Sequence, residues 1–135
     1  MKIFLDANIL FSAAKSNGAI RFLIMSLLDK EHQLVINLFV QEEAERNLTA
    51  KAPEALEYFY DLILRLTIVP LTNYQLLPKK ASFLPLKDQP VLQAALHDRC
   101  DVLLTGDRTH FGRLYGERIE SLAVYSPGAL ADLIL

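Results

Sequence analysis

Four carboxylates stand at positions where a parallel sheet would bring them to one edge. Asp6 directly follows the strand-like run Lys2–Leu5, and Asp107 follows a second run of this kind. Asp88 begins a predicted helix, and Glu43 lies inside another. Each acid alone is also typical of a helix cap, a turn or a solvated charge. Carboxylates that gather raise one another's pKa, so the group as a whole predicts a bound cation.

The residue types at this edge indicate which cation and which chemistry. Oxygen ligands without His or Cys favour a hard divalent ion, Mg²⁺ or Mn²⁺. Such an ion suits hydrolysis of a phosphodiester, because it activates water and neutralises charge on the phosphoryl oxygens. Thr105 could orient a carboxylate or the water through its hydroxyl, and Asn8 could fix the rotamer of Asp6. Asn8 is equally typical of an ordinary turn or cap.

The choice of glutamate depends on the faces of its helix. Glu43 shares a stripe with Phe39 and Asn47, and this stripe is largely apolar. A carboxylate on such a stripe is costly unless it is paired or bound to a cation. We therefore prefer Glu43, while Glu42 stays the competing choice because its own stripe includes Leu38 and Phe39.

Other side chains near the same edge have weaker functional interpretations. His110 could contact a phosphate or shuttle a proton, but a His beside a buried Phe is more typical of a packed helix start. Lys87, Arg108 and Arg113 could contact phosphates of a nucleic acid. Five of the seven phenylalanines are most simply core residues, namely Phe11, Phe22, Phe39, Phe59 and Phe111.

The elements that position these residues alternate between short strands and helices. Apolar residues recur at helical spacing over Ala19–Lys30, and Ser126-Pro127 is typical of a helix cap and first helical position. The predicted strands are Lys2–Leu5, Gln33–Ile36, Thr67–Val69, Asp101–Leu104 and Leu122–Tyr125. The predicted helices are Ile9–Ala14, Ala19–Lys30, Leu38–Ala50, Pro53–Leu66, one beginning at Asp88, and Gly128–Leu135, with an irregular connection over Thr72–Lys87.

This alternation predicts an α/β fold with a parallel sheet covered on both faces. Ligands of such sheets bind beyond the carboxyl ends of the strands. A length of 135 residues, 52% of them apolar, fits one domain over residues 1–135. The net charge of −2 argues against a polycationic nucleic-acid coat but allows a local basic rim.

The cysteine count and the apolar runs indicate where in the cell the protein is expected. Cys100 is the single cysteine, so neither an intrachain disulfide nor a Cys-based zinc site is possible. The longest apolar runs fall well short of the roughly 18 residues that span a bilayer. We expect a cytoplasmic protein with no membrane contact.

Several segments together resemble the PIN-domain family. The resemblance implies a three-layer α/β/α sandwich with a mostly parallel central sheet, and metal-dependent ribonuclease activity. It aligns Asp6, Glu43, Asp88 and Asp107 with the family's acidic quartet. Where some members carry a further acid, this chain has His110. The matching segments span nearly the whole chain and are Asp6-Ala7-Asn8, Glu43-Ala44-Glu45-Arg46-Asn47-Leu48, Asp88-Gln89-Pro90-Val91-Leu92-Gln93-Ala94-Ala95 and Leu103-Leu104-Thr105-Gly106-Asp107 followed by His110-Phe111.

The resemblance also implies a biological role. Many small members are VapC-like toxins of toxin–antitoxin pairs, often homodimeric and inhibited by a partner protein. We therefore expect an Mg²⁺- or Mn²⁺-dependent endoribonuclease, with RNA, an antitoxin and a second copy as partners. Asp6, Asp88 and Asp107 would hold the metal, and Glu43 would hold it or position the attacking water.

Two other functions compete with this prediction. One is a phosphotransferase with an aspartyl nucleophile at the end of the first strand. That class usually has a second Asp two residues later, where this chain has Asn8. The other is a PIN-fold interaction module without catalytic activity, which would bind no metal.

Overall fold

A six-stranded sheet forms the centre of the molecule, with the strand order β3-β2-β1-β4-β6-β5. The structure, a computed structural model, describes residues 1–71 and 76–135. Neighbouring strands pair in parallel except β5, which pairs antiparallel with β6. The strands are β1 (Lys2–Leu5), β2 (Gln33–Asn37), β3 (Thr67–Val69), β4 (Val102–Leu104), β5 (Arg118–Ile119) and β6 (Leu122–Tyr125).

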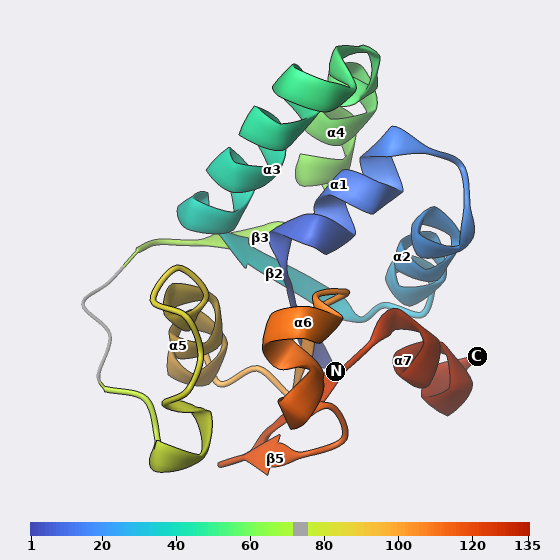
Figure 1. Cartoon of the computed structure of the whole chain (residues 1–135). Helices are drawn as coiled ribbons and strands as arrows, with labels where there is room; N and C mark the ends of the chain where they lie inside the picture. The colour runs from blue at the N-terminus through green and yellow to red at the C-terminus, as the bar shows by residue number, and fades with distance from the viewer. Residues whose placement is uncertain (72–75) are drawn as a thin grey trace.

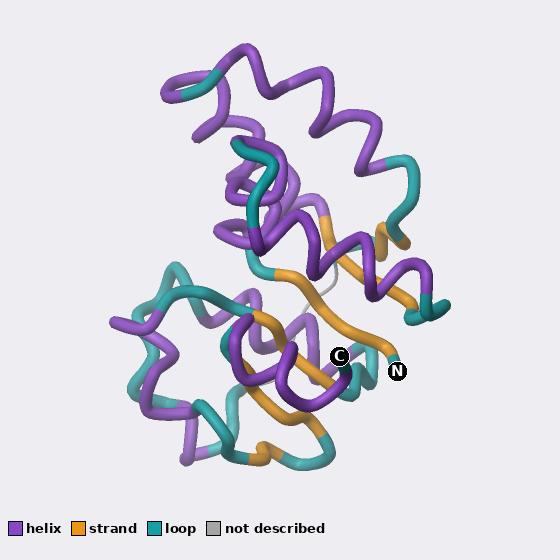
Figure 2. The backbone as a smooth tube through the Cα atoms, turned by 90° about the vertical axis from the view of Figure 1, so that its right-hand side faces the viewer, coloured by secondary structure: helices purple, strands orange, loops and turns teal. Residues whose placement is uncertain are grey.

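Helices cover both faces of this sheet, so the predicted α/β/α sandwich with a mostly parallel sheet is confirmed. In Figure 1 the helices α1, α3 and α4 pack together on one side, and α5 and α6 lie on the other. Figure 2 shows the strands as a layer between these groups. The helices are α1 (Ala7–Lys15), α2 (Ala19–Asp29), α3 (Leu38–Lys51), α4 (Leu56–Ile63), α5 (Gln89–His97), α6 (Arg108–Phe111) and α7 (Pro127–Ile134).

The two halves of the sheet meet between β1 and β4, and the chain changes halves after β3. β1 pairs with β2 on one side and with β4 on the other, and Leu5 lies opposite Leu104. Parallel pairing in this register brings the residues after both strands to the same edge. Asp6 and Thr105 are therefore neighbours although 99 positions separate them.

The predicted elements differ from the observed ones mainly at short segments. The helix expected from Pro53 divides into a 3₁₀ turn (Pro53–Ala55) and α4, because Pro53 begins only the turn. The short β5 and α6 were not predicted, since two and four residues carry no readable periodicity. Ser126 caps α7 as predicted, accepting from the amide of Ala129. The expected irregular connection lies partly outside the described residues, at 72–75.

The core is built on the strands. Strands β1, β2 and β4 are almost fully buried, as parallel strands covered on both faces must be. Phe59 and Phe111 are fully buried as predicted, but Phe22 is 67% exposed, so its assignment to the core is wrong. Over residues 1–71 and 76–135, no helix combines the length and the apolar character needed to cross a bilayer.

Candidate metal centre at the carboxyl ends of the strands

Asp6 sits at the turn from β1 into α1, where it is held by a set of hydrogen bonds that we call the Asp6 network. Its Oδ1 accepts from the amide of Ala7 at 2.7 Å, as a helix-capping carboxylate does. Its Oδ2 accepts from the hydroxyl of Thr105 at 2.8 Å and from the amide group of Asn8 at 3.1 Å. The side chain is thus fixed in one orientation from three directions.

Thr105 and Asn8 extend this network to the loop after β4. The Thr105 hydroxyl, fully buried, also accepts from the backbone amide of Asp107 at 3.1 Å. The side-chain carbonyl of Asn8 accepts from the amide of Gly106 at 2.8 Å. A Cβ at position 106 would lie 3.3 Å from that oxygen, so a glycine lets the loop come this close. Both residues therefore contact the groups that they were predicted to orient.

Burial dominates the electrostatics of Asp6. The residue is only 5% exposed. Desolvation raises its pKa from 3.8 to about 6, and the nearby carboxylates of Glu43 and Asp88 push the pKa in the same direction. The hydrogen bonds from Thr105 and Ala7 oppose this rise because they stabilise the charged form. A cation in the site would stabilise that form further.

A second group of side chains, which we call the Asp88 cluster, faces Asp6 and consists of Asp88, Asp107 and His110. The Nδ1 atom of His110 lies 2.8 Å from Oδ2 of Asp88 and 2.8 Å from Oδ2 of Asp107. One potential ligand atom from each residue lies within 4.8 Å of the other two. Two elements supply them: Asp88 precedes α5, while Asp107 and His110 come from the start and third residue of α6.

The cluster contains buried polar atoms without hydrogen bonds. Oδ2 of Asp88 and Nδ1 of His110 are buried and have no partner with hydrogen-bond geometry, although they lie 2.8 Å apart. Buried polar atoms are normally satisfied, so these two require an explanation. Asp88 also makes no capping bond to α5, which excludes the simple cap interpretation. Asp107, in contrast, does cap α6 by accepting from the amide of His110 at 3.1 Å.

The pKa of Asp88 responds to the same crowding. Desolvation raises the pKa of its carboxyl group, and the charge of Asp107 adds to this rise. His110 and Lys87 act in the opposite direction, since a positive charge favours the carboxylate.

Glu43 completes the carboxylates around one pocket of about 240 Å³, which we call the acidic pocket. Glu43 is half-buried on α3 and faces this pocket, whereas Glu42 is exposed and lies outside it. The geometry thus favours Glu43 over Glu42. The residues that line the pocket are Asp6, Ala7, Asn8, Phe11, Glu43, Asn47, Lys51, Lys87, Asp88 and Asp107.

The three cations proposed for phosphate contact have different surroundings. Lys87 lines the acidic pocket. Arg108 is exposed at the first residue of α6, next to Asp107. Arg113 stacks over the ring of Phe83, with its guanidinium 4.0 Å from the ring centroid, and it is not part of the pocket lining. Lys87 is therefore the best placed of the three.

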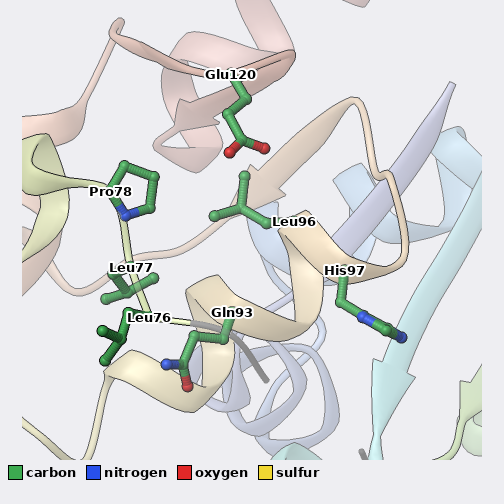
Figure 3. A pocket seen from close by; sticks show the side chains of 7 residues that line it. All are labelled: Leu76, Leu77, Pro78, Gln93, Leu96, His97 and Glu120. Carbon is green, nitrogen blue, oxygen red and sulfur yellow. The ribbon is translucent and has the colours of Figure 1, made fainter. Parts of the chain in front are cut away.

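Another hollow, of about 120 Å³, lies between α5 and the segment Leu76–Pro78. Figure 3 shows its aliphatic wall of Leu77, Pro78 and Leu96, with Glu120 above it and the ring of His97 turned away. A single carboxylate lines it, and the only potential metal-ligand group within residues 1–71 and 76–135 is the Asp88 cluster. The candidate site is therefore the acidic pocket.

Sequence reasoning did not assign His110 to the site. The preferred interpretation, a packed helix-start residue, fits its place in α6, but its Nδ1 also meets two carboxylates. The signal was the spacing of three residues from Asp107, which places both side chains on one face of a helical turn. Phe11, Asn47 and Lys51 were also missed as pocket residues, and they are reached only through the packing of α1 against α3.

The donor set fits a divalent ion. One potential ligand atom each from Asp88, Asp107 and His110 lies within 4.8 Å of the other two, close enough for a single ion to contact all three. The unsatisfied Oδ2 of Asp88 and Nδ1 of His110 are the atoms that such an ion would satisfy. Carboxylates with one imidazole suit Mn²⁺ and also accept Mg²⁺.

Comparison with known proteins supports this fold. No protein-family model matches the chain, and no curated protein sequence matches it. Among solved structures, VapBC2 from Rickettsia felis, bound to a DNA fragment from its promoter, is similar with a TM-score of 0.65 and 20% identity, over 93% of this chain and 98% of that one. DNA-bound VapBC from Salmonella typhimurium has a TM-score of 0.63 and 18% identity, over 94% of this chain and 98% of that one. VapBC-1 from nontypeable Haemophilus influenzae has a TM-score of 0.61 and 16% identity, over 95% of this chain and 99% of that one.

These similarities cover nearly the whole chain at low identity, so they establish the fold. The chain has a VapC-like PIN-domain fold, and the resemblance found in the sequence is confirmed at that level.

Proposed function

We propose that this protein is an Mg²⁺- or Mn²⁺-dependent endoribonuclease and the toxin of a toxin–antitoxin pair. The proposal rests mainly on the acidic pocket, which is lined by four carboxylates, two of which also meet the ring of His110 at 2.8 Å. A VapC-like PIN-domain fold supports it. We assign the whole chain, residues 1–135, to a single nuclease domain that acts in the cytoplasm.

Each side chain has a defined part in this proposal. Asp6, Asp88 and Asp107 would hold the metal ion, with His110 as a further ligand. Glu43 would hold the ion or orient the attacking water. A bound Mg²⁺ or Mn²⁺ would activate water and neutralise the charge that develops on the phosphoryl oxygens. Asn8 and Thr105 keep Asp6 in position, and Lys87 contacts a phosphate of the RNA.

The first test is cleavage of a labelled single-stranded RNA with Mn²⁺ and with EDTA. We expect the wild type to cleave only with the ion. Asp107→Asn should reduce the rate by more than about 100-fold, since even residues that merely support a metal ligand are worth about 10- to 100-fold. Glu43→Gln should lose most activity, and Glu42→Gln, one residue away and outside the pocket, should not. Equal losses in both glutamate variants would refute the assignment of Glu43.

Thermal unfolding with and without metal separates the competing functions without relying on activity. An ion that binds only the folded protein stabilises it by about 2.7 kcal/mol at 100 times its dissociation constant. The inactive module predicts no stabilisation and no cleavage. The phosphotransferase predicts a covalent phosphate on Asp6, seen as added mass after incubation with a phosphodonor. Asp6 is a poor nucleophile here because both of its oxygens already accept hydrogen bonds.

A protein partner is part of the same proposal. The similar solved structures are VapBC assemblies. This chain also exposes large apolar side chains, among them Phe22, Leu64 and Leu133, and exposed apolar surface is typical of protein contacts. We propose an antitoxin protein and a second copy of the chain as partners. Co-expression with the product of the adjoining gene, followed by size measurement in solution, tests both.

A further inference from the structure

The end of the acidic pocket away from the Asp88 cluster has a different chemical character. It is lined by Phe11 of α1 and by Asn47 and Lys51 of α3. Phe11 is half-buried, so part of its ring packs on the core and part faces the pocket. One pocket thus contains carboxylates at one end and, at the other, an aromatic ring with one lysine of the lining, Lys51.

Two ammonium groups gather at this ring. Nζ of Lys15 lies 5.6 Å from the centroid of Phe11, and Nζ of Lys51 lies 5.9 Å from it. Both distances are within the range of a cation–π contact. Neither lysine forms an ion pair with any residue in 1–71 or 76–135, whereas Lys80 pairs with Glu117. Two like charges at one ring, without a counter-ion from the protein, are suited to an anionic ligand.

Asn47 adds a polar group that no other part of the structure uses. Its side-chain amide makes no hydrogen bond to the described part of the chain. An Asn side chain offers one acceptor and two donor hydrogens, which is the pattern that reads the edge of a nucleobase. It lies on α3 one turn after Glu43, so it links the carboxylates to the aromatic end.

We propose that this end of the pocket is a subsite for one unpaired nucleotide of single-stranded RNA. The base stacks on Phe11, its edge meets Asn47, and the flanking phosphates contact Lys15 and Lys51. The proposal rests on the ribonuclease function and specifies its substrate. Aromatic rings beside cationic side chains are the means by which proteins bind single strands.

The form of the site selects against a duplex. The bases of a double helix are stacked on one another, so their faces cannot reach a ring inside a pocket. A volume of about 240 Å³ is below the roughly 300 to 1,000 Å³ of typical pockets for small ligands. The pocket therefore has room for about one nucleotide, and the rest of the strand lies outside.

Fluorescence anisotropy with a short labelled RNA tests the proposal. We would use Asp107→Asn as the background, with Mg²⁺ present, so that the RNA stays intact. Phe11→Leu should weaken binding of the single strand by about tenfold, in line with the loss of one base stack. Phe11→Trp should restore it, and Tyr60→Leu, an exposed ring outside the pocket, should have no effect. Binding of the matching duplex should change less than about twofold in every ring variant.

The lysines are tested by the salt dependence of the same binding. Lys15→Gln and Lys51→Gln should each reduce the slope of log affinity against log salt by about 0.7, as expected for one lost phosphate contact on a single strand. Lys30→Gln, an exposed lysine outside the pocket, should leave the slope unchanged.

The outcomes separate this proposal from the ribonuclease function. Unchanged single-strand affinity in Phe11→Leu, or equal weakening for strand and duplex, overturns the subsite even if the wild type cleaves RNA. Ring-dependent binding of the single strand supports the subsite even if no cleavage is found. Thermal unfolding of each variant excludes loss of fold, and recovery in Phe11→Trp excludes a packing effect.

Discussion

The Asp6 network and the Asp88 cluster treat their carboxylates in opposite ways. In the Asp6 network, every oxygen of the acid accepts hydrogen bonds from the protein. In the Asp88 cluster, two carboxylate oxygens and an imidazole nitrogen meet at 2.8 Å, and two of these atoms have no hydrogen bond. The protein surrounds the first group with hydrogen-bond donors, whereas the two carboxylates of the second meet at a single imidazole.

This difference indicates that the Asp6 network and the Asp88 cluster have different roles in metal binding. A carboxylate held from three directions provides a ligand of fixed position, which the protein maintains with or without an ion. Two carboxylates that share one imidazole gain stability when a cation enters. We infer that the Asp6 network provides position, and that both groups gain from a bound cation because burial raises the pKa of Asp6 and of Asp88.

The largest expected effect concerns the charge of Asp6 in the metal-free protein. Its pKa is about 6 when folded and 3.8 as the ordinary value, so the folded state binds the proton more tightly. Stability from this group is therefore present below about pH 4 and is lost as the pH rises through about 6. About two pK units correspond to about 3 kcal/mol. In EDTA, Asp6→Asn should gain about 3 kcal/mol relative to wild type between about pH 4 and about pH 7.

Urea unfolding of the variant and the wild type at about pH 4 and at about pH 7 measures this gain in stability. The difference between the variant and the wild type cancels the titration of other groups that the two share. If the difference in unfolding free energy between the variant and the wild type did not change with pH, folding would not raise the pKa of Asp6. Asn lacks one acceptor oxygen, so a constant loss at all pH values is expected in addition and does not alter the slope.

Much of this arrangement was predictable from the sequence because strand ends follow simple rules. Asp6 and Asp107 follow strands that read clearly as buried runs, and adjacent parallel strands must bring them together. Glu43 was preferred through its apolar helical stripe, and it faces the pocket whereas Glu42 does not. The exposure of Phe22 was also readable, since it lies off the stripe formed by Leu23, Ile24 and Leu27.

The remainder depends on contacts that no local pattern encodes. His110 lies on a helix of four residues, which is too short for a periodic signal. Its role follows from the approach of Asp88, which belongs to another element. Phe11 and Lys51 meet only because α1 packs on α3, and a single sequence does not show how two helices cross.

A smaller effect should distinguish the Asp6 network from the Asp88 cluster by whether a substitution lowers or raises the unfolding free energy. Thr105→Val keeps the shape but removes the hydroxyl that donates to Asp6 and accepts from Asp107. We expect a loss of about 2 kcal/mol of unfolding free energy, measured in EDTA at neutral pH. Asp88→Asn, which removes one of several repelling charges, should leave stability unchanged or raise it.

Thr105→Ser serves as the matched control because it retains the hydroxyl and loses only a methyl group, worth about 1 kcal/mol. If Thr105→Val were no more destabilising than Thr105→Ser, the hydrogen bonds of the Asp6 network would not contribute to stability. If Asp88→Asn were as destabilising as Thr105→Val, the two halves would not differ.

The smallest expected effect sharpens the contrast at His110, the one nitrogen donor among the candidate ligands. Imidazole favours Mn²⁺ over Mg²⁺, whereas carboxylate oxygen serves both ions. Replacing the ring by a carboxylate in His110→Asp should reduce the preference for Mn²⁺ by about tenfold, equal to about 1.4 kcal/mol. Calorimetric titration of both ions gives this ratio directly. The same substitution at His97, which lines the other hollow, should leave the ratio unchanged. An unaltered ratio in His110→Asp would place the ion on the carboxylates alone, and the 2.8 Å contacts of the ring would then only help to hold Asp88 and Asp107 together.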